Sequence, residues 1–361
     1  ITKTARRCLC QLARGGFDDP LIIEVAVPTL TLESVRSRPT GEKLMKIALR
    51  HTLIITVVAA CCAIPAHAAE FINILTGGTS GIYYPLGVSL SQIYSKAIPG
   101  SKTAVQATKA SVENLNLLQA GRGEVGISLG DSLSDAWKGN EDAGFKAPLK
   151  KLRTIAALYP NYIHFVAAAD SGIKSLADIK GKRISVGAPK SGTELNSREI
   201  LKAAGISYKD FAKVEYLSYA ESVELMKNRQ LDVTLLSSGL GVAALRDLAT
   251  SQKVVFLSIP AEIVNKINDP AFQVGIIPAR TYEGQDTDVS TVSVQNYLVT
   301  HEGVSNETVY TMTRSMFENL DQMIAAHAAA KAIKRENAAK APPATLHPGA
   351  EKYYREIGLI K

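Results

Sequence analysis

From residue 71 onward, short apolar runs alternate with amphipathic segments, and this alternation constrains the fold more than any other feature of the chain. The apolar runs have the length of β-strands, and the segments between them have helical spacing and end at Gly or Pro. Strands that alternate with helices favour parallel sheets covered by helices on both faces. We therefore predict an α/β fold with strands at 71–75, 103–107, 125–129, 152–159, 164–168, 183–186, 213–217, 233–236, 254–257 and 291–299.

The segments between these runs predict helices whose ends carry recognisable signals. Ser111 is the expected N-cap of the second helix. Residues 304–340 are also mostly helical in pattern. We interpret their Ala-rich part, 324–341, as an exposed helix because it contains Lys, Arg and Glu, the alternative being a low-complexity linker. The other predicted helices are 84–97, 111–120, 193–204, 219–228 and 242–250.

Met45–Ala69 has the three parts of a secretory signal peptide: a basic start, an apolar centre and a small-residue end. The apolar centre is shorter than the roughly 20 residues that span a bilayer. Ala66-His67-Ala68 fits the A-x-A cleavage pattern, so we predict that residues 45–68 are removed on export. The alternative is a lipoprotein, because Val58-Ala59-Ala60-Cys61 resembles a lipobox that would place a lipid on Cys61.

Residues 1–44 precede Met45 and have no clear periodicity. We interpret them as sequence upstream of the natural start, the alternative being a genuine extension without regular structure. In either case they are excluded from the fold prediction.

The positive charge and the cysteines are concentrated before the predicted cleavage site. Residues 1–68 hold 9 of the 41 Lys and Arg and 5 of the 34 Asp and Glu, which leaves a net charge of +3 on the remainder. The basic balance is therefore poor support for nucleic-acid binding, and we predict no nucleic-acid partner. Because all four cysteines lie at positions 8, 10, 61 and 62, the mature chain has no disulfide or thiolate metal site. We predict no metal and no cofactor.

Phe71–Gly87 combines a short strand, a loop of Gly, Thr and Ser, and the start of a helix. Backbone N–H groups of such a loop point outward, and the helix dipole favours negative charge. In an exported chain, this arrangement indicates capture of a small anion outside the cytoplasm. The alternative for a loop of this composition is a plain turn or helix cap.

A second loop of the same kind runs from Gly187 to Thr193. Its spacing resembles a P-loop, but Thr193 and Glu194 stand where Lys and Ser or Thr are needed, so we predict no nucleotide site. What remains is an anion site at a helix N-terminus, with Ser191, Thr193 and Lys190 as side-chain donors.

Two further strand ends carry polar residues, Ser128 to Asp131 and Ser237 to Gly239. Ligands of open α/β sheets bind beyond the carboxyl ends of the strands, so four such ends predict a cleft between two lobes. Asp131 would accept from a ligand ammonium group, the alternative being a helix N-cap. Tyrosines 83, 159 and 219 would donate hydroxyls or form apolar walls, the alternative being core packing.

Catalytic signatures are mostly absent from the chain. It has no G-x-S-x-G, H-E-x-x-H or G-x-G-x-x-G motif, and its histidines are scattered without ligand spacing. His164 lies in a strand pattern, where a structural role is favoured over a catalytic one. We predict that the protein is not an enzyme.

Five segments together resemble the TAXI family, the solute receptors of tripartite ATP-independent periplasmic (TRAP) transporters. They are TGGTSGIYYPLG (76–87), Ser128–Asp131, SGIKSLADIKGKRISVGAPKSGT (171–193), DTDVSTVSVQNYLVT (286–300) and LHPGAEKYYREIGL (346–359). The resemblance implies a type II periplasmic-binding-protein fold: two α/β lobes that close on a ligand in the cleft. It also implies a periplasmic location, a small carboxylate ligand (glutamate-like, 2-oxoacid or dicarboxylate) and a membrane permease partner driven by an ion gradient.

The resemblance also implies which residues bind the ligand. Carried over by position, the binding residues are Thr79, Ser80, Tyr83, Ser128, Asp131, Ser191, Gly192 and Thr193, with Tyr219 and Ser237 as weaker assignments. The expected lobes are 69–162, 163–276 and a return to the first lobe over 277–361, with hinge crossings near 159–164 and 273–279. The alternatives are a periplasmic sensor that presents its ligand to a signalling partner, and an enzyme that uses Asp131 or His164 as base.

Overall fold

The computed structural model describes residues 70–361, which lie within one compact unit of the chain. The predictions for the upstream segment, the signal peptide and Cys61 fall outside the described residues. None of the helices within 70–361 combines the length and apolar character that a membrane span requires.

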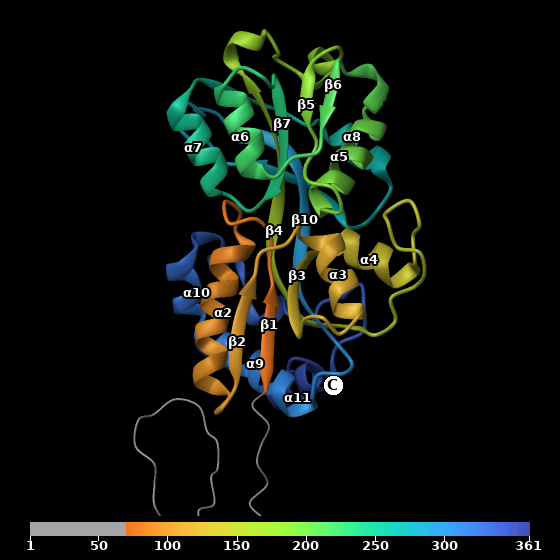
Figure 1. The fold of residues 1–361 in the computed structure, drawn as a ribbon, viewed down its shortest axis with the longest axis vertical. Coiled ribbons are helices and arrows are strands. Elements are labelled where there is room, and N and C mark those ends of the chain that lie inside the picture. Colours follow the sequence, from red (N-terminus) through yellow and green to blue (C-terminus); the bar gives the residue numbers. More distant parts are fainter. Residues whose placement is uncertain (1–69) are drawn as a thin grey trace, which may run out of the picture. The chain divides into compact units, whose positions relative to one another are not determined.

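Ten strands of the described residues form one mixed sheet (Figure 1). Eight of them follow the order β2-β1-β3-β10-β4-β7-β5-β6, while β8 pairs with β4 and β9 with β10. The strands are β1 (Phe71–Leu75), β2 (Lys102–Gln106), β3 (Val125–Leu129), β4 (Leu152–Ala168), β5 (Arg183–Ser185), β6 (Lys213–Glu215), β7 (Val233–Ser238), β8 (Val254–Leu257), β9 (Phe272–Ile277) and β10 (Val289–His301).

The parallel pairs of this sheet define two lobes. In lobe 1, β1 pairs in parallel with β2 and β3, and in lobe 2, β5 pairs in parallel with β6 and β7. The long strands β4 and β10 run antiparallel to each other through both lobes (Figure 1). The predicted α/β class with two lobes is therefore confirmed, and the parallel pairing expected from the sequence holds within each lobe but not for β4 and β10.

The chain crosses between the lobes within β4 and β10. β4 pairs with β10 up to Tyr162 and with β7 from the same residue onward, while β10 pairs with β9 up to Val294 and with β3 from Asn296. The second hinge crossing expected at 273–279 is therefore wrong. That segment is β9, an edge strand of lobe 2, whose exposed and buried residues do not alternate as a half-buried strand does.

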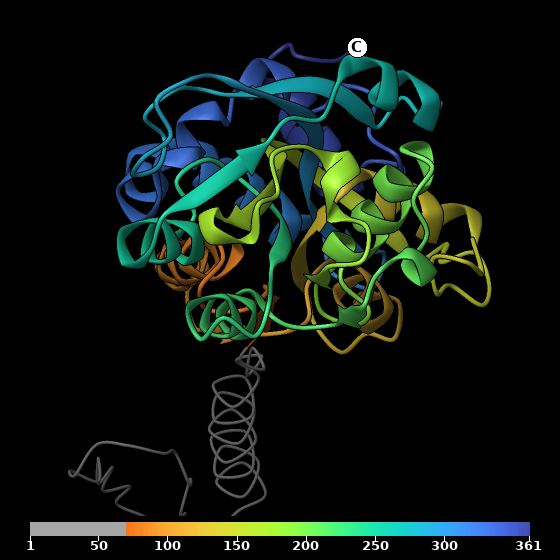
Figure 2. The same ribbon diagram turned by 90° about the horizontal axis from the view of Figure 1, so that it is seen from above.

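Helices cover both faces of the sheet. α2, α9, α10 and α11 lie on one face of lobe 1 and α6 and α7 on the same face of lobe 2, whereas α3, α4, α5 and α8 cover the other face (Figure 1). Seen from above, helices lie on both sides of the strands (Figure 2). The helices are α2 (Tyr83–Ala97), α3 (Ser111–Gln119), α4 (Gly130–Lys138), α5 (Gly192–Ala203), α6 (Tyr219–Lys227), α7 (Ala243–Ser251), α8 (Ala261–Ile267), α9 (Asn306–Glu318), α10 (Leu320–Ala326) and α11 (Pro348–Glu356).

Three predictions of local structure differ from the structure. Helix α4 follows β3 directly and was missed, because it has few apolar residues and begins with Gly130. Ser111 is not the N-cap of α3, because the N-cap position is Ala110. The Ser111 hydroxyl accepts a hydrogen bond from the Leu129 backbone N–H. The Ala-rich segment is not an exposed helix: α10 ends at Ala326, and two 3-10 turns follow. Ala330 in the first turn, and Ile333 and Ala338 directly after the two turns, are buried and pack into the core.

The apolar core of the α2 face is continuous across both lobes. It joins β1 and α2 to α6 and α7, with the buried side chains of Ile82 and Tyr159 close to the crossing. Burial of this apolar area is the main favourable term in the folding of residues 70–361, which contain no cysteine.

Gly87 of α2 packs closely against Thr76 at the end of β1. This close contact predicts that a larger residue at position 87 lowers the stability of the protein. A Cβ atom at position 87 would lie 2.4 Å from the Thr76 Cγ2 atom. Gly87→Ala should lower the free energy of unfolding by about 1–3 kcal/mol, because the overpacked core must shift. Urea unfolding measures the loss, and Ser95→Ala on the exposed side of α2 is the control, with an expected change within about 0.5 kcal/mol. Equal stability of the two variants would contradict the close packing.

Candidate functional site

A cavity of about 110 Å³ lies at the carboxyl ends of strands from both lobes. The lobe 1 contribution comes from the loops before α2 and α3, and the lobe 2 contribution from the loops before α5 and α6 and from the end of β7. Asn161, on the crossing segment of β4, also lines it. Pockets for drug-sized ligands are typically about 300 Å³ or more, so a cavity of this volume is suited to a smaller organic molecule.

Four helices begin at the wall of this cavity. The lining includes Tyr83 at the start of α2, Ser111 at the start of α3, Thr193 in the first turn of α5 and Tyr219 at the start of α6. The first N–H groups of a helix have no partner within the helix, and its N-terminus carries about half a positive charge. Four such N-termini therefore give the cavity a positive potential.

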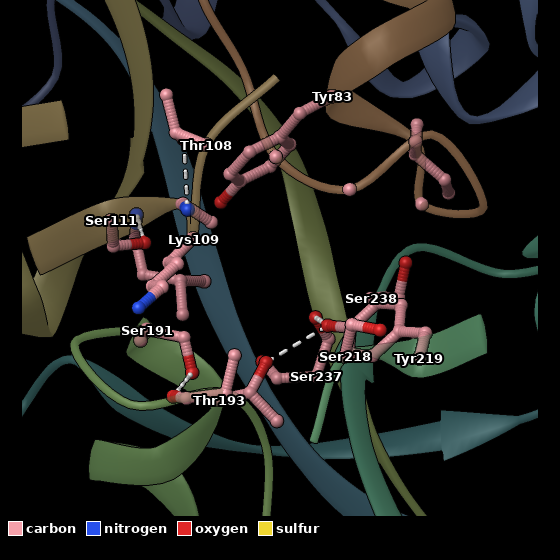
Figure 3. A pocket seen from close by; sticks show the side chains of 18 of the residues that line it. Tyr83, Thr108, Lys109, Ser111, Ser191, Thr193, Ser218, Tyr219, Ser237 and Ser238 are labelled. Carbon is pink, nitrogen blue, oxygen red and sulfur yellow. Dashed lines mark hydrogen bonds between the residues drawn. The ribbon is translucent and has the colours of Figure 1, made fainter. Parts of the chain in front are cut away.

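Lys109 is the one charged side chain among the described residues that line the cavity. It belongs to the loop between β2 and α3, and Figure 3 shows its side chain extended toward the loop of Ser191. Its backbone N–H donates to Glu113, so the loop that carries it is fixed by its own hydrogen bond. An ammonium group beside four helix N-termini is suited to binding an anion.

The hydroxyl protons at the cavity wall are mostly committed to protein acceptors. The Tyr219 hydroxyl donates to the carbonyl of Ser237 at 2.6 Å, so in its 2.8 Å contact with Thr193 the threonine must donate. The Ser191 hydroxyl donates to the carbonyl of Ala188 at 2.6 Å. These hydroxyl oxygens therefore offer lone pairs to a ligand, whereas donors come from backbone N–H groups and Lys109.

Burial keeps the tyrosine hydroxyls of the site neutral. It raises the pKa of Tyr219 to about 12 and that of Tyr83 well above its ordinary value. Both hydroxyls therefore retain their protons at neutral pH, and neither adds negative charge to the cavity.

Six of the ten predicted binding residues line the cavity together. They are Tyr83, Ser191, Gly192, Thr193, Tyr219 and Ser237.

The other four predicted residues lie outside the lining. Thr79 is exposed, and the carbonyl of Ser80 accepts from the backbone of Ala244. The Ser128 hydroxyl is buried in β3 and donates to the carbonyl of Leu129. Asp131 is buried in the first turn of α4, and it is not that helix's N-cap, which is the Leu129 position.

The sequence prediction missed the loop between β2 and α3, which supplies Thr108, Lys109 and Ser111. The sequence does carry a signal, because this loop joins a predicted strand to a predicted helix, as the two predicted anion-binding loops do. Unlike those two loops, residues 108–110 contain no glycine. Asn161 and Ser218 were also missed, whereas Ser238 belongs to the predicted strand end at 237–239.

His164 has a structural position on β4. It is fully buried, its Nε2 atom lies 3.0 Å from the Tyr282 hydroxyl, and it does not line the cavity. Burial lowers its pKa to about 4, so it is neutral at physiological pH. Within residues 70–361, no group of three or more His, Cys, Asp or Glu side chains is arranged to hold a metal ion.

The two lobes joined by β4 and β10 have the fold of periplasmic binding proteins. PhnD1 from Prochlorococcus marinus MIT 9301, solved in complex with methylphosphonate, is similar to the chain, with a TM-score of 0.53 and 13% identity over 81% of this chain and 99% of that chain. The periplasmic aliphatic sulphonate binding protein SsuA from Escherichia coli matches with a TM-score of 0.42 and 16% identity, over 74% of this chain and 80% of that one. Residues 74–358 match the model of the NMT1-like family, and the chain belongs to that family.

Ser191 caps α5, and this contact predicts a specific stability effect. Its hydroxyl accepts from the Glu194 backbone N–H at 3.1 Å. Ser191→Ala should lower the free energy of unfolding by about 1 kcal/mol, whereas Ser191→Gly should cost only a few tenths, because glycine leaves the helix end open to water. Urea unfolding of both variants measures the difference. A loss as large for Gly as for Ala would mean that the bond to Ala188, and not the cap, stabilises this loop.

Proposed function

We propose that the protein is an extracytoplasmic solute receptor that captures a small carboxylate and delivers it to a TRAP-type membrane permease. The observation that carries the proposal is the convergence of four helix N-termini and Lys109 on one small cavity whose described lining has no acidic side chain. A carboxylate buried without donors would be costly, and this wall supplies backbone donors and a cation.

The division between donors and acceptors supports a more detailed ligand class. Backbone N–H groups and Lys109 would bind the carboxylate, while the lone pairs of Ser191, Thr193 and Tyr219 would face a donor group elsewhere on the ligand. A carboxylate with an ammonium or hydroxyl group fits this wall better than a simple fatty acid does. Glutamate-like and hydroxyacid ligands are therefore the first candidates, followed by 2-oxoacids and dicarboxylates.

Direct backbone contacts between the lobes support capture by closure. The Glu113 N–H donates to the carbonyl of Lys190 at 3.2 Å, and the Ala244 N–H to the carbonyl of Ser80 at 3.4 Å. Each bond joins one lobe to the other beside the cavity, so opening the hinge must break both. We propose that the permease recognises this closed form, in keeping with the TAXI-like segments of the sequence.

The cavity wall favours binding over catalysis. Its described lining contains neither a carboxylate nor an imidazole that would act as general base. The protein should therefore release its ligand unchanged.

A thermal-shift screen tests the proposal directly. Glutamate, glutamine, 2-oxoglutarate, malate, succinate and short-chain acids would be compared with methylphosphonate and an alkanesulfonate at several concentrations. A ligand that binds only the folded state raises Tm by mass action, so one carboxylate should give a concentration-dependent rise. A rise for the phosphonate or sulfonate alone would retain anion binding and reject the carboxylate. No rise for any anion would reject the proposed function.

Lys109 provides the matched mutational test. Lys109→Gln should weaken binding of the active carboxylate by about fivefold, corresponding to about 1 kcal/mol for a partly solvated charge-assisted contact. Calorimetric titration measures the affinity, and Lys96→Gln in the last turn of α2 removes the same charge away from the cavity. Equal affinities for the two variants would show that Lys109 does not contact the anion.

A further inference from the structure

Asp131 and Asn196 form a buried hydrogen bond between the two lobes. Asp131 lies on α4 of lobe 1 and Asn196 on α5 of lobe 2, and the Asn196 amide donates to the Asp131 Oδ2 atom at 2.6 Å. Asp131 is 4% exposed and Asn196 is fully buried. Since the partners belong to different lobes, opening the hinge breaks this bond and returns both groups to water.

A chain of buried hydrogen bonds leads to this pair from the cavity through both crossing strands. Tyr83 donates to Asn296 on β10, and Asn296 donates to the Asn161 side chain on β4 at 2.7 Å. Asn161 donates to the Ser237 carbonyl at 2.9 Å, and the Ser237 hydroxyl donates to Asn196 at 2.7 Å. These hydrogen bonds fix the orientation of each side-chain amide. Because the Asn196 Oδ1 atom accepts from Ser237, its Nδ2 group is the one that faces Asp131, and it can only donate to that carboxyl group.

Among residues 70–361, no cation pairs with the Asp131 carboxyl group to compensate its charge. Its Oδ1 atom has no hydrogen-bond partner, and no salt bridge to it forms within residues 70–361. The charged groups that face it are acidic, namely Asp135 on α4 and Asp269 before β9. Arg198 on α5 is engaged by Glu194 and the carbonyl of Asp142.

An ionised carboxylate in this position would be energetically unfavourable, because burial removes its hydration water and the neighbouring acidic groups repel it. Burial raises the pKa of Asp131 to about 7, an effect that the Ser132 N–H and the Asn196 amide only partly oppose. Separation of the lobes would expose the same group to water, where an aspartate has a pKa near 4. The closed form therefore holds a proton that the open form releases over the range between these two values.

We propose that Asp131 and Asn196 form a proton-linked closure latch, so that capture of a solute by this protein is accompanied by uptake of a proton. This inference rests on the proposed function, because it requires that the two lobes close when the solute is captured. Asp131 acts as a positioning residue, since it does not line the cavity. Its effect reaches the ligand through the equilibrium between open and closed forms.

The direction of the pH effect follows from linkage. A group whose pKa is raised in the closed form favours closure fully below about pH 4, and this advantage is lost as the pH rises toward 7. Affinity for the active carboxylate should therefore fall by about tenfold per pH unit between pH 5 and pH 7, and level off above that. Calorimetric titrations in buffers of different ionisation enthalpy at pH 6 should also report about one proton taken up per ligand bound.

Asp131→Asn is the decisive variant, because asparagine keeps an acceptor for Asn196 and cannot ionise. Its affinity should be independent of pH between 5 and 7, with no proton uptake. Asp142→Asn removes the same charge from the exposed loop after α4 and should keep the slope of the unsubstituted protein. Asn196→Ala should weaken binding at every pH, because the latch loses its donor.

A measurement without ligand separates this inference from the proposed function. Protonation of Asp131 favours the closed form, so the radius of gyration of the protein without added ligand, measured by small-angle X-ray scattering, should fall between pH 7.5 and pH 4.5. The radius of gyration of Asp131→Asn should be the same at the two pH values. That result with no ligand found in the screen would support the latch and reject the receptor function. Parallel pH profiles of the two proteins, in the radius of gyration and in the affinity of any ligand found, would overturn the latch.

Discussion

The antiparallel pair β4 and β10 is the constraint on which the rest of the structure depends. These two strands belong to both lobes, so the parallel strands of each lobe are added to opposite ends of one ladder. The register of that ladder shifts beside Asn296, where β10 leaves β9 and joins β3. A bulge of this kind turns side chains and permits bending, which is what a hinge between lobes needs.

The same topology brings the anion-binding elements together. The strands β1 to β3 of lobe 1 are parallel to one another, as are β5 to β7 of lobe 2, so the helices that follow them begin at one edge of the sheet. Because the two lobes meet at those edges, the N-termini of α2 and α3 face those of α5 and α6 across one cavity. Electrostatic preference for an anion thus results from the arrangement of backbone dipoles, and Lys109 adds to it.

A polar chain crosses the hinge through an otherwise apolar region. Asn161 and Asn296 occupy the crossing segments of β4 and β10, and their amides satisfy each other and their neighbours. Burial of an amide is favourable only when its donors and acceptors have hydrogen-bond partners. This series of hydrogen bonds therefore fixes the relative position of the lobes more specifically than apolar packing alone. Asp131, with one unpartnered oxygen, is the group in the chain whose state depends on pH.

The sequence by itself determined the local elements and the fold class. Periodicity located nine of the ten strands and the helices α2, α3, α5, α6 and α7 to within a few residues, because apolar patterning and end signals are local properties. It divided β4 into two strands, 152–159 and 164–168, whereas the structure has one continuous strand. It missed β9, whose residues do not alternate, and α4, whose residues are mostly polar. Only the tertiary structure decided which strand ends meet. It brought Lys109 into the cavity and gave Asp131 a partner 65 residues away in the chain, since both contacts depend on how the two lobes close.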